Sequence, residues 1–481
     1  MDKGRVTSLL FIQDPQITNN SYPFFITCLL HFSAIFHNIP RISPFFPVTS
    51  TLLPIAKKIP RSNHNVSRRF ISENALKVIS RLSSEGFEAY LVGGAVRDMM
   101  LGKTPKDFDI ATDATPEELR KLFRNARIIG RRFRIVHILF GPEIIEVTTF
   151  RGHHREDEAE NPGKQLTGST GILLRDNVYG SMEEDALRRD FSINALYYSS
   201  RDFCIYDFTN GAEDIERKTL RIIGDPVTRM NEDPVRILRA IRFSAKLGFH
   251  LEPATKAAIE PCRELLSHIP PARLFDELVK LFTTGNALES YELLKQHDIL
   301  GYLLSSSALI TKNSRHESLV KQALINTDRR IESGKTVNPA FMYAVFLWPR
   351  FSTLWNELEQ QGAPSMAALH EASQRVFQEQ SSRTAIPKRI QLTIKEIWEL
   401  QPLLQKRPRN KLLKVSEHPR FRAGYDFLLL REQSGELPPG AGAWWTSFQE
   451  QTPESQQQSI LNLAPDARPK KRRRRRKPSA A

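Results

Sequence analysis

Cysteine is scarce in this 481-residue sequence, which contains only Cys28, Cys204 and Cys262. The three lie far apart, without a C-x-x-C pair or an even-numbered cysteine framework. This scarcity argues against a disulfide scaffold and against a cysteine zinc site. Such a composition fits a reducing compartment, so we expect a cytoplasmic location.

Long apolar runs are missing as well. The longest candidate, Phe24–Phe36, contains 13 residues and is interrupted by His31, whereas a helix needs about 20 residues to span a bilayer. Lys3 and Arg5 could begin a secretory signal, but no small-x-small cleavage site follows them. We therefore expect no stable membrane insertion, and we interpret residues 1–65 as a disordered extension outside the folded core.

Acidic residues are too few to balance the basic ones. The 69 Lys and Arg residues exceed the 54 Asp and Glu residues, which gives a formal net charge of +15 and favours polyanionic partners such as nucleic acid or an anionic membrane surface. Arg468–Lys477 alone contributes nine basic residues, without which the net charge falls to +6. From Ser434 the chain is rich in Gly, Pro, Gln and Arg, so residues 434–481 are predicted to form a disordered basic tail.

Strand and helix patterns alternate in the first part of the folded region. Apolar residues recur at helical spacing from Ser72 to Gly86, which predicts a helix. Thr115-Pro116-Glu117-Glu118 is a capping box with proline at the first helical position. The other expected elements are a strand over 89–92, a helix over 95–101, a strand over 108–111, a helix over 116–123, and strands over 134–140 and 143–150 joined by a Gly141-Pro142 turn.

The rest of the folded region is mainly helical in pattern. Residues 152–180 are polar and contain glycine, so we expect a mobile loop there. One strand pair, Phe203–Phe208 with Leu220–Ile223, is expected among the helices. The predicted fold class is therefore α+β. Helices are expected over 183–196, 234–247, 272–283 and 288–296, and helical periodicity continues to about residue 432.

The strongest chemical signal is the sequence Asp107-Phe108-Asp109. On a strand, positions i and i+2 share one face, so both carboxylates would point the same way and Phe108 into the core. Two carboxylates held so close repel each other unless a cation neutralises them, and Mg²⁺ prefers one or two carboxylates together with substrate phosphates. An isolated D-x-D is nevertheless common on protein surfaces, and the spacing alone favours a metal site only weakly.

A glycine turn precedes this pair and strengthens the interpretation. Gly93 and Gly94 follow an apolar strand and open a helix that carries Arg97. Glycines let backbone N–H groups approach a phosphate closely, and Arg97 could bind a phosphate oxygen. The alternative is an ordinary strand-to-helix turn in which Arg97 pairs with Asp98. A phosphate turn followed by a D-x-D strand describes a nucleotidyltransferase site.

Residues 91–98 together with 107–112 resemble the head signature of the polymerase beta superfamily, specifically that of bacterial poly(A) polymerases and CCA-adding enzymes, the class II tRNA nucleotidyltransferase/poly(A) polymerase family. The resemblance implies a small nucleotidyltransferase head of mixed sheet and helices, followed by a helical neck, body and leg. On this basis we expect the head over residues 66–200, a base-recognising neck over 201–290 and an RNA-binding helical body over 291–433.

The resemblance also implies a two-metal mechanism, in which an RNA 3′-hydroxyl attacks the α-phosphate of a nucleoside triphosphate and pyrophosphate leaves. Asp107 and Asp109 are then the catalytic carboxylates and would hold Mg²⁺, with two ions expected. A third carboxylate normally joins from a neighbouring strand. Glu146 is our choice for this metal ligand, with Glu143 as the substitute; a solvated charge at the strand edge is an equally good interpretation of Glu146.

Residues 188–196 match the same family. The resemblance implies that Arg189 binds the incoming nucleotide and that Asp190 helps to organise the site, which makes Asp190 a third catalytic candidate. Asn194 lies four residues further on, on the same face of the expected helix, and could contact the ribose. Alternatively, Asp190 forms a structural ion pair with Arg188 or Arg189.

Residues 232–243 are the last matching motif. Asp233 is a plausible N-cap, Pro234 takes the first helical position, and Arg236 and Arg239 share one helix face. An aspartate acceptor beside an arginine donor matches the edges of adenine and cytosine, whereas guanine and uracil invert the order. The resemblance implies that Asp233, Arg236 and Arg239 belong to a nucleotide site that selects bases without a template. An amphipathic helix with a solvated basic face is the alternative.

The stretch Gly130–His137 looks typical of bacterial poly(A) polymerases, and a basic tail suits an enzyme that binds unspecified RNA. We therefore expect AMP transfer from ATP to the 3′ ends of mRNA, regulatory RNA and decay fragments, in RNA processing and decay. RNA-decay or RNA-chaperone proteins are possible partners. The alternatives are a CCA-adding tRNA nucleotidyltransferase and a non-catalytic RNA-binding adaptor.

Overall fold

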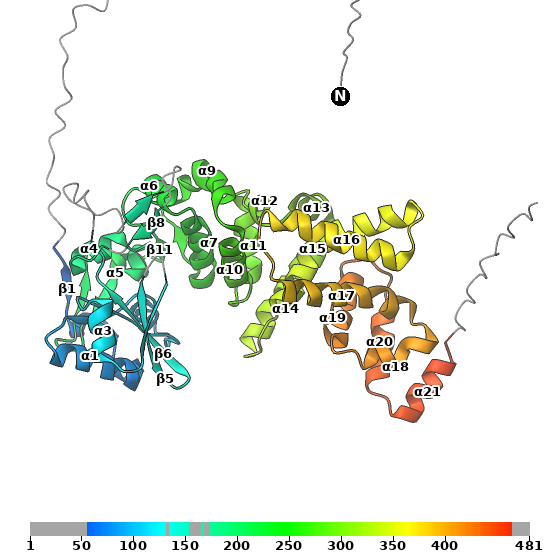
Figure 1. Ribbon diagram of the computed structural model, residues 1–481, viewed down its shortest axis with the longest axis horizontal. Helices are drawn as coiled ribbons and strands as arrows, with labels where there is room; N and C mark the ends of the chain where they lie inside the picture. The colour runs from blue at the N-terminus through cyan, green and yellow to red at the C-terminus, as the bar shows by residue number, and fades with distance from the viewer. Residues whose placement is uncertain (1–54, 131–133, 153–164, 168–172, 177, 464–481) are drawn as a thin grey trace, which may run out of the picture. The chain divides into compact units, whose positions relative to one another are not determined.

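The computed structural model of the chain describes residues 55–130, 134–152, 165–167, 173–176 and 178–463 (Figure 1). The strands and short helices of the head come first, and from α6 onward the described chain is almost entirely helical. This arrangement confirms the predicted α+β class. Within the described residues, no helix is both long enough and apolar enough to cross a membrane.

The head is built on an eight-stranded mixed sheet in the order β1-β10-β9-β2-β3-β6-β5-β4. All neighbouring strands are antiparallel except β3 and β6, which are parallel. The strands are β1 (Lys57–Ile59), β2 (Ala89–Val92), β3 (Asp109–Thr112), β4 (Ala126–Ile129), β5 (Ile135–Phe140), β6 (Glu143–Thr149), β9 (Leu196–Tyr198) and β10 (Ile205–Asp207).

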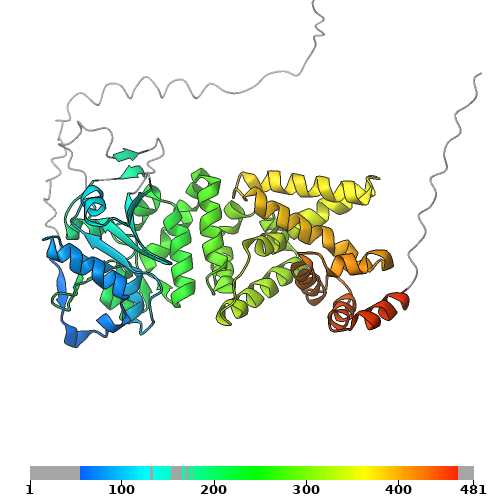
Figure 2. The same cartoon turned by 60° about the horizontal axis from the view of Figure 1, so that its bottom comes forward.

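Two helices of the head begin at side-chain caps. Ser72 caps α1 (Glu73–Ser84) by accepting a hydrogen bond from the backbone N–H of Ala75, and α1 runs beside the sheet in both views (Figures 1 and 2). The expected capping box of Thr115 and Glu118 is present at the start of α3 (Pro116–Leu122). The remaining head helices are α2 (Gly94–Met100), α4 (Met182–Arg188) and α5 (Gly211–Glu216).

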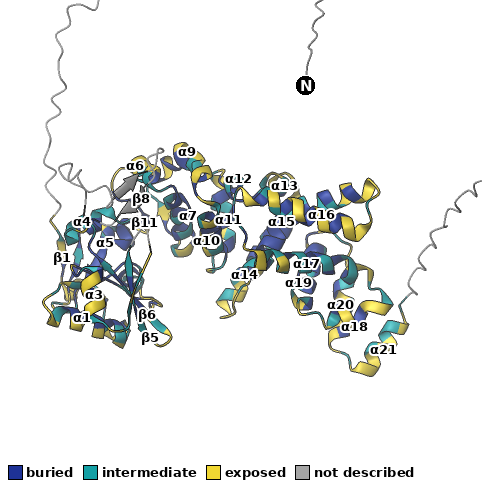
Figure 3. Cartoon of the chain, in the orientation of Figure 1, coloured by how far each residue is buried: buried dark blue, intermediate teal, exposed yellow. Residues whose placement is uncertain are grey.

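The helical part buries its apolar side chains between successive helices, and Figure 3 shows buried residues concentrated on helices such as α7, α10 and α15. A short parallel pair, β11 (Thr219–Leu220) with β12 (His250–Leu251), lies near its beginning. The helices are α6 (Pro226–Glu232), α7 (Val235–Leu247), α8 (Pro253–Ala257), α9 (Ile259–Cys262), α10 (Pro271–Phe282), α11 (Ala287–Gln296), α12 (Leu300–Leu303), α13 (Ser307–Lys312), α14 (Ser314–Glu332), α15 (Pro339–Gln360), α16 (Ser365–Ser381), α17 (Lys388–Lys406), α18 (Leu412–Ser416), α19 (Phe421–Gln433), α20 (Ala441–Gln449) and α21 (Pro453–Leu461).

Two predicted domain boundaries of the head are wrong. The extension was expected to reach residue 65, but β1 pairs with β10 and buries Ile59, so the sheet already includes residues 57–59. The head was expected to end at residue 200, yet β10 belongs to the same sheet. A three-residue edge strand carries too few alternating residues to be recognised in the sequence. Residues 1–54 lie outside the described part of the chain.

The predicted disordered tail over residues 434–481 is also wrong in its first half. Helices α20 and α21 occupy residues 441–461. Trp445 and Phe448 are buried in an apolar cluster with Leu404, Leu412 and Phe421. Two aromatic side chains on one face anchor α20 although the surrounding composition is polar. Residues 464–481, which contain the arginine run, lie outside the described residues.

Three local predictions between residues 152 and 223 need correction. The expected helix over 183–196 ends at Arg188, and a 3₁₀ turn over Ser192–Asn194 leads into β9. The expected strand pair does not form, because β10 pairs with β9 and β1 while β11 pairs with β12. Inside the expected loop, β7 (Gln165–Thr167) and β8 (Leu173–Asp176) form an antiparallel pair. Burial of the aromatic β9 in the sheet centre overrides the helical pattern of the residues before it.

Candidate active site

Asp109 is the first residue of β3 and lies opposite Val92 of β2 and Glu146 of β6. Phe108 is 7% exposed, which confirms the prediction that it turns into the core. Asp107 precedes the strand and is exposed. The D-x-D sequence therefore spans the entry into a central strand, where the sheet supports both carboxylates.

Asp109 has an unusual electrostatic environment. Burial raises the pKa of Asp109 to about 6, the negative charges of Glu146 and Asp107 add to this effect, and Arg189 opposes it. A half-buried carboxylate with a raised pKa and further carboxylates beside it is a favourable place for a cation. The donor chemistry of this site therefore fits Mg²⁺.

The position of a third metal ligand stays a prediction. Over the described residues, no three His, Cys, Asp or Glu side chains gather closely enough to hold a metal ion. Mg²⁺ needs only one or two carboxylates when substrate phosphates and water complete its shell, so Asp107 and Asp109 remain suitable without Glu146. Glu143 accepts a hydrogen bond of 2.5 Å from the Asn74 amide, which holds its carboxylate away from that role.

The glycine turn is tightly fitted against the carboxylates. Gly93 has a backbone φ of 75°, which residues other than glycine rarely adopt. A Cβ atom built on Gly93 would lie 3.5 Å from Oδ2 of Asp109 and 3.8 Å from Nη1 of Arg189. Gly94 follows as the first residue of α2. The glycine turn, the Asp109 carboxylate and Arg189 therefore lie close together, whereas the sequence suggested Arg97 as the arginine at this turn.

Arg97 makes the contact that the sequence left as the alternative. Its side chain is buried, and Nε and Nη2 donate to Oδ1 of Asp98 over 2.9 and 2.7 Å. Nη1 donates to Oδ1 of Asn194 over 2.6 Å. Arg97 thus ties α2 to the turn that carries Asn194. Its contact with a phosphate stays a prediction.

Asp190 is held by Arg239 of α7 rather than by Arg188 or Arg189, the alternative partners expected from the sequence. Nε of Arg239 on α7 donates to Oδ2 of Asp190 over 2.7 Å, and Asn194 donates to Oδ1 over 3.2 Å. Burial opposes ionisation, but Arg239 and these hydrogen bonds lower the pKa of Asp190 to about 2. Asp190 and Asn194 do interact, but through a 3₁₀ turn and not along one helix face.

Arg189 is positioned by two residues that the sequence did not suggest. Its Nε donates to Oδ2 of Asp185 over 3.2 Å and to the Tyr197 hydroxyl over 2.9 Å. The Tyr197 hydroxyl donates in turn to Oδ2 of Asp185 over 2.6 Å. The only signal in the sequence is the i, i+4 spacing of Asp185 and Arg189. Tyr197 is fully buried, and no pattern distinguishes it from a core aromatic residue.

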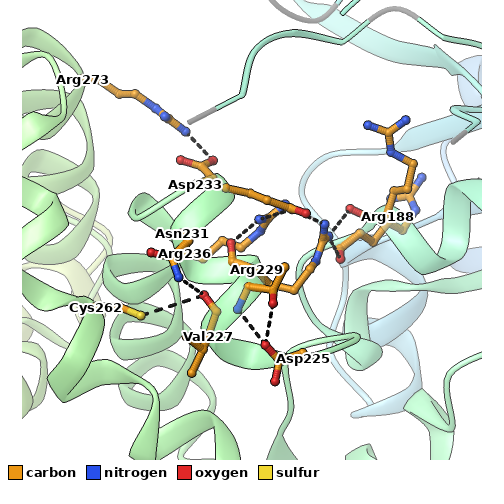
Figure 4. A network of polar contacts seen from close by, with 12 residues as sticks. Arg188, Asp225, Val227, Arg229, Asn231, Asp233, Arg236, Cys262 and Arg273 are labelled. Atoms are coloured by element: carbon orange, nitrogen blue, oxygen red, sulfur yellow. Dashed lines mark hydrogen bonds and ion pairs between the residues drawn. The ribbon is translucent and has the colours of Figure 1, made fainter. Parts of the chain in front are cut away.

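The base-reading candidates form a second polar network (Figure 4). Oδ2 of Asp233 accepts from Nη2 of Arg273 on α10 over 2.7 Å. Nη1 of Arg236 contacts Oε2 of Glu232 at 3.1 Å and the backbone carbonyl of Arg229. The predicted N-cap role of Asp233 is wrong, because α7 begins at Val235 without a side-chain cap and Asp233 extends toward Arg273 instead.

Arg229 connects this network to the head. Its Nη2 donates to the backbone carbonyls of Arg188 and Arg189 over 2.6 and 2.9 Å, while Nη1 donates to Oε2 of Glu232 over 2.6 Å. Figure 4 shows Arg229 between Asp233 and Arg188. Arg229, Glu232 and Arg273 were not singled out in the sequence. They have no local pattern, because their partners lie on other elements or in a connecting loop.

One further row of side chains crosses the sheet beside the carboxylates. Asp109, Glu146, His137 and Arg127 are successive register partners on β3, β6, β5 and β4. Nε2 of His137 lies 3.4 Å from Oε1 of Glu146, and Arg127 is exposed at the edge strand. The row therefore runs from Asp109 and Glu146 to the positively charged Arg127 on the edge strand β4.

Three family models match separate stretches of the chain. The poly(A) polymerase head domain matches residues 89–221, a family described as a probable RNA and SrmB-binding site of polymerase A matches 248–309, and the polymerase A arginine-rich C-terminus matches 361–479. The "tRNA-processing enzyme (apo form I)" structure shares the fold with a TM-score of 0.55, at 22% identity, over 82% of this chain and 98% of that one.

Curated relatives agree with these matches. Poly(A) polymerase I of Salmonella typhimurium (strain LT2) is 47% identical over 86% of this chain and 90% of that protein. Poly(A) polymerase I of Escherichia coli O157:H7 is 46% identical over 88% and 92%, respectively. The CCA-adding enzyme of Leuconostoc citreum is 39% identical, but over only 48% of this chain and 54% of that protein. The chain belongs to the bacterial poly(A) polymerase family.

Proposed function

We infer that the protein is a polynucleotide adenylyltransferase that extends RNA 3′ ends without a template. It transfers AMP from ATP to the terminal 3′-hydroxyl and releases pyrophosphate. The observation that carries this function is the similarity to poly(A) polymerase I over nearly the whole chain, including the helical part. Similarity to the CCA-adding enzyme covers about half of either protein.

The residues of the head have distinct tasks in this reaction. Asp107 and Asp109 would hold Mg²⁺, and two ions are expected. Bound Mg²⁺ would neutralise negative charge on the phosphates and on the attacking oxygen. Gly93 gives the triphosphate close access to the backbone, and Arg189 presents a fixed cation beside Asp109. Ionised Asp109 is required, because a protonated carboxyl is a poor ligand for a cation.

We assign base selection to Asp233 and Arg236. An aspartate acceptor and an arginine donor together match the edges of adenine and cytosine and reject guanine and uracil. In the structure each side chain is held by its own partner, Arg273 for Asp233 and Glu232 for Arg236. These partners fix the acceptor and the donor before a nucleotide binds, which lowers the ordering cost of base recognition.

A product assay tests this function. Purified protein is incubated with Mg²⁺, with labelled ATP or CTP, and with either an unstructured RNA or a tRNA that lacks its CCA end. Long A-tracts on both RNAs are the expected result. Addition restricted to C-C-A on the tRNA would instead identify a CCA-adding enzyme. Absence of any incorporation by the wild-type protein would identify a non-catalytic RNA-binding adaptor.

We further propose that cellular mRNA, regulatory RNA and decay fragments are the RNA substrates, and that the protein acts in the cytoplasm. RNA-decay or RNA-chaperone proteins are the partners that we propose, and residues 248–309 are the place to seek them, since the matching family model is described as a probable RNA and SrmB-binding site. Affinity capture with wild-type protein and with a variant altered on the exposed surface of this segment checks the assignment. Equal recovery of partners by both proteins would contradict it.

A further inference from the structure

A separate pocket of about 760 Å³ lies in the helical part of the chain. It is lined by α14, α15, α17 and α19, and by the segments that lead into α15 and α19. These helices are neighbours in the structure (Figure 1). Its volume falls within the roughly 300–1,000 Å³ typical of ligand sites. None of the residues assigned to nucleotide transfer lines it.

The apolar part of the lining suits a flat ring. Val337, Pro339, Phe341, Ile397 and Leu430 contribute to it. Phe341 is half-buried and packs edge-on against Phe427, with ring centroids 6.1 Å apart, which fixes the plane of its ring. A nucleobase stacks favourably on such a ring whatever its sequence identity.

The polar part of the lining is basic. Arg330, Arg420 and Arg422 line the pocket together with a single acidic residue, Asp426. Nε of Arg422 lies 3.0 Å from Oδ1 of Asp426, and Nε of Arg330 donates to the backbone carbonyl of Thr336 over 2.7 Å. Nε of Arg420 donates to Oε2 of Glu396 over 3.0 Å. Arg420 and Arg422 are thus each paired with a carboxylate, whereas Arg330 donates to a backbone carbonyl, which leaves one positive charge in excess and favours an anionic ligand. Arg330 and Arg422 are exposed, so the cations are accessible from solvent.

We propose that this pocket binds one unstacked nucleotide of single-stranded RNA, with the base against Phe341 and its phosphate at Arg330. A planar apolar site beside arginines matches the two chemical features that every nucleotide combines. Polymeric RNA fits better than free ATP, because a rim of exposed arginines can contact the phosphates on either side of the bound nucleotide. The proposal rests on the proposed function, since it assigns a second contact to the same RNA substrate.

Two neighbouring arginines on α14 provide a matched test. Arg330 lines the pocket, whereas Arg329 is also exposed and does not line it. The full-length Arg330→Glu variant is expected to bind a fluorescent 15-nucleotide oligo(A) at least tenfold more weakly than wild type, and Arg329→Glu less than threefold. Both variants should keep the wild-type KM for ATP and the kcat at saturating RNA, because the head is unchanged. Equal loss of RNA affinity in the two variants overturns the proposal.

A pocket-filling pair keeps the charge constant. Ala423 lines the pocket on α19, and Ala367 is an exposed alanine on α16. Ala423→Leu should weaken oligo(A) binding at least fivefold with an unchanged melting temperature, and Ala367→Leu should leave it unchanged. An oligo(A) affinity of Ala423→Leu equal to that of wild type overturns the proposal. The proposal is also overturned if Ala423→Leu weakens the binding of ATP and leaves the binding of oligo(A) unchanged. The product assay with labelled ATP tests the proposed function separately, because failure of the wild-type protein to transfer AMP would refute that function and not the pocket.

Discussion

Asp109 combines two properties that conflict in the absence of a cation. Its position beside Glu146 and Asp107 suits the proposed metal site, while burial and these charges raise its pKa from 3.8 to about 6. The folded protein therefore binds the Asp109 proton more tightly than the unfolded chain. The stabilisation from this proton is complete below pH 3.8 and is lost as the pH rises through about 6. At neutral pH the ionised carboxylate destabilises the fold by up to roughly 3 kcal/mol.

The substitution Asp109→Asn should separate catalysis from stability. It removes the charge at constant shape, so we expect no AMP transfer, unchanged RNA binding, and a melting temperature several degrees above wild type at pH 8 in EDTA. The difference in melting temperature should shrink below pH 6 and on addition of Mg²⁺ to the wild type. Asp276→Asn, at an exposed position on α10, serves as the control. A lower melting temperature for Asp109→Asn at pH 8 would contradict the raised pKa.

Two adjacent tyrosines of β9 offer a matched pair of substitutions. The Tyr197 hydroxyl contacts both Arg189 and Asp185, whereas the buried Tyr198 hydroxyl has no hydrogen-bond partner in the described part of the chain. Tyr197→Phe should raise the KM for ATP roughly tenfold, since a hydrogen bond to a charged group contributes about 1.5–3 kcal/mol. The KM for RNA should not change. Tyr198→Phe should match wild type in both constants, and equal effects in the two variants would remove Tyr197 from nucleotide positioning.

At the level of the element, patterns within one segment predicted the structure well. The periodicity of α1, the cap of α3 and the D-x-D strand depend on neighbours within about four residues, so the sequence displays them directly. Contacts between distant segments were missed. The Asp190–Arg239 pair joins residues 49 positions apart, and the Asp233–Arg273 pair joins residues 40 positions apart. The elements β1 and α20 depend on pairing or burial against remote partners, which no local pattern encodes.

The aromatic pair of α20 tests how that helix is held. Trp445 is buried and donates from Nε1 to the carbonyl of Leu404 over 2.8 Å, whereas Trp444 is half-buried. We expect Trp445→Ala to cost about 3–5 kcal/mol of local stability and Trp444→Ala clearly less. Hydrogen exchange of the α19 and α20 amides measures both effects. Equal loss of protection in the two variants would show that Trp445 does not anchor α20.

At the level of the whole molecule, the head and the helical part are coupled by arginines. Arg239 of α7 binds Asp190, and Arg229 of α6 binds the carbonyls of Arg188 and Arg189. Arg189 in turn stands beside Asp109, and its positive charge partly offsets the rise in the pKa of that carboxyl. Arg229 and Arg239 therefore join α6 and α7 to the segment that carries Arg189 and Asp190.

The distribution of charge leads to a prediction about RNA affinity. Nine of the basic residues lie in Arg468–Lys477, beyond the described helices, and each phosphate contact in a single strand contributes about 0.7 to the slope of log affinity against log salt. Deleting residues 466–481 should weaken RNA binding and lower this slope by one or more, because several contacts disappear together. The kcat at saturating RNA should not change. Replacing the same residues with a Gly-Ser segment of equal length should reproduce the effect of the deletion if charge is the cause. A salt slope in the deletion variant equal to that of wild type would show that the tail makes no phosphate contacts.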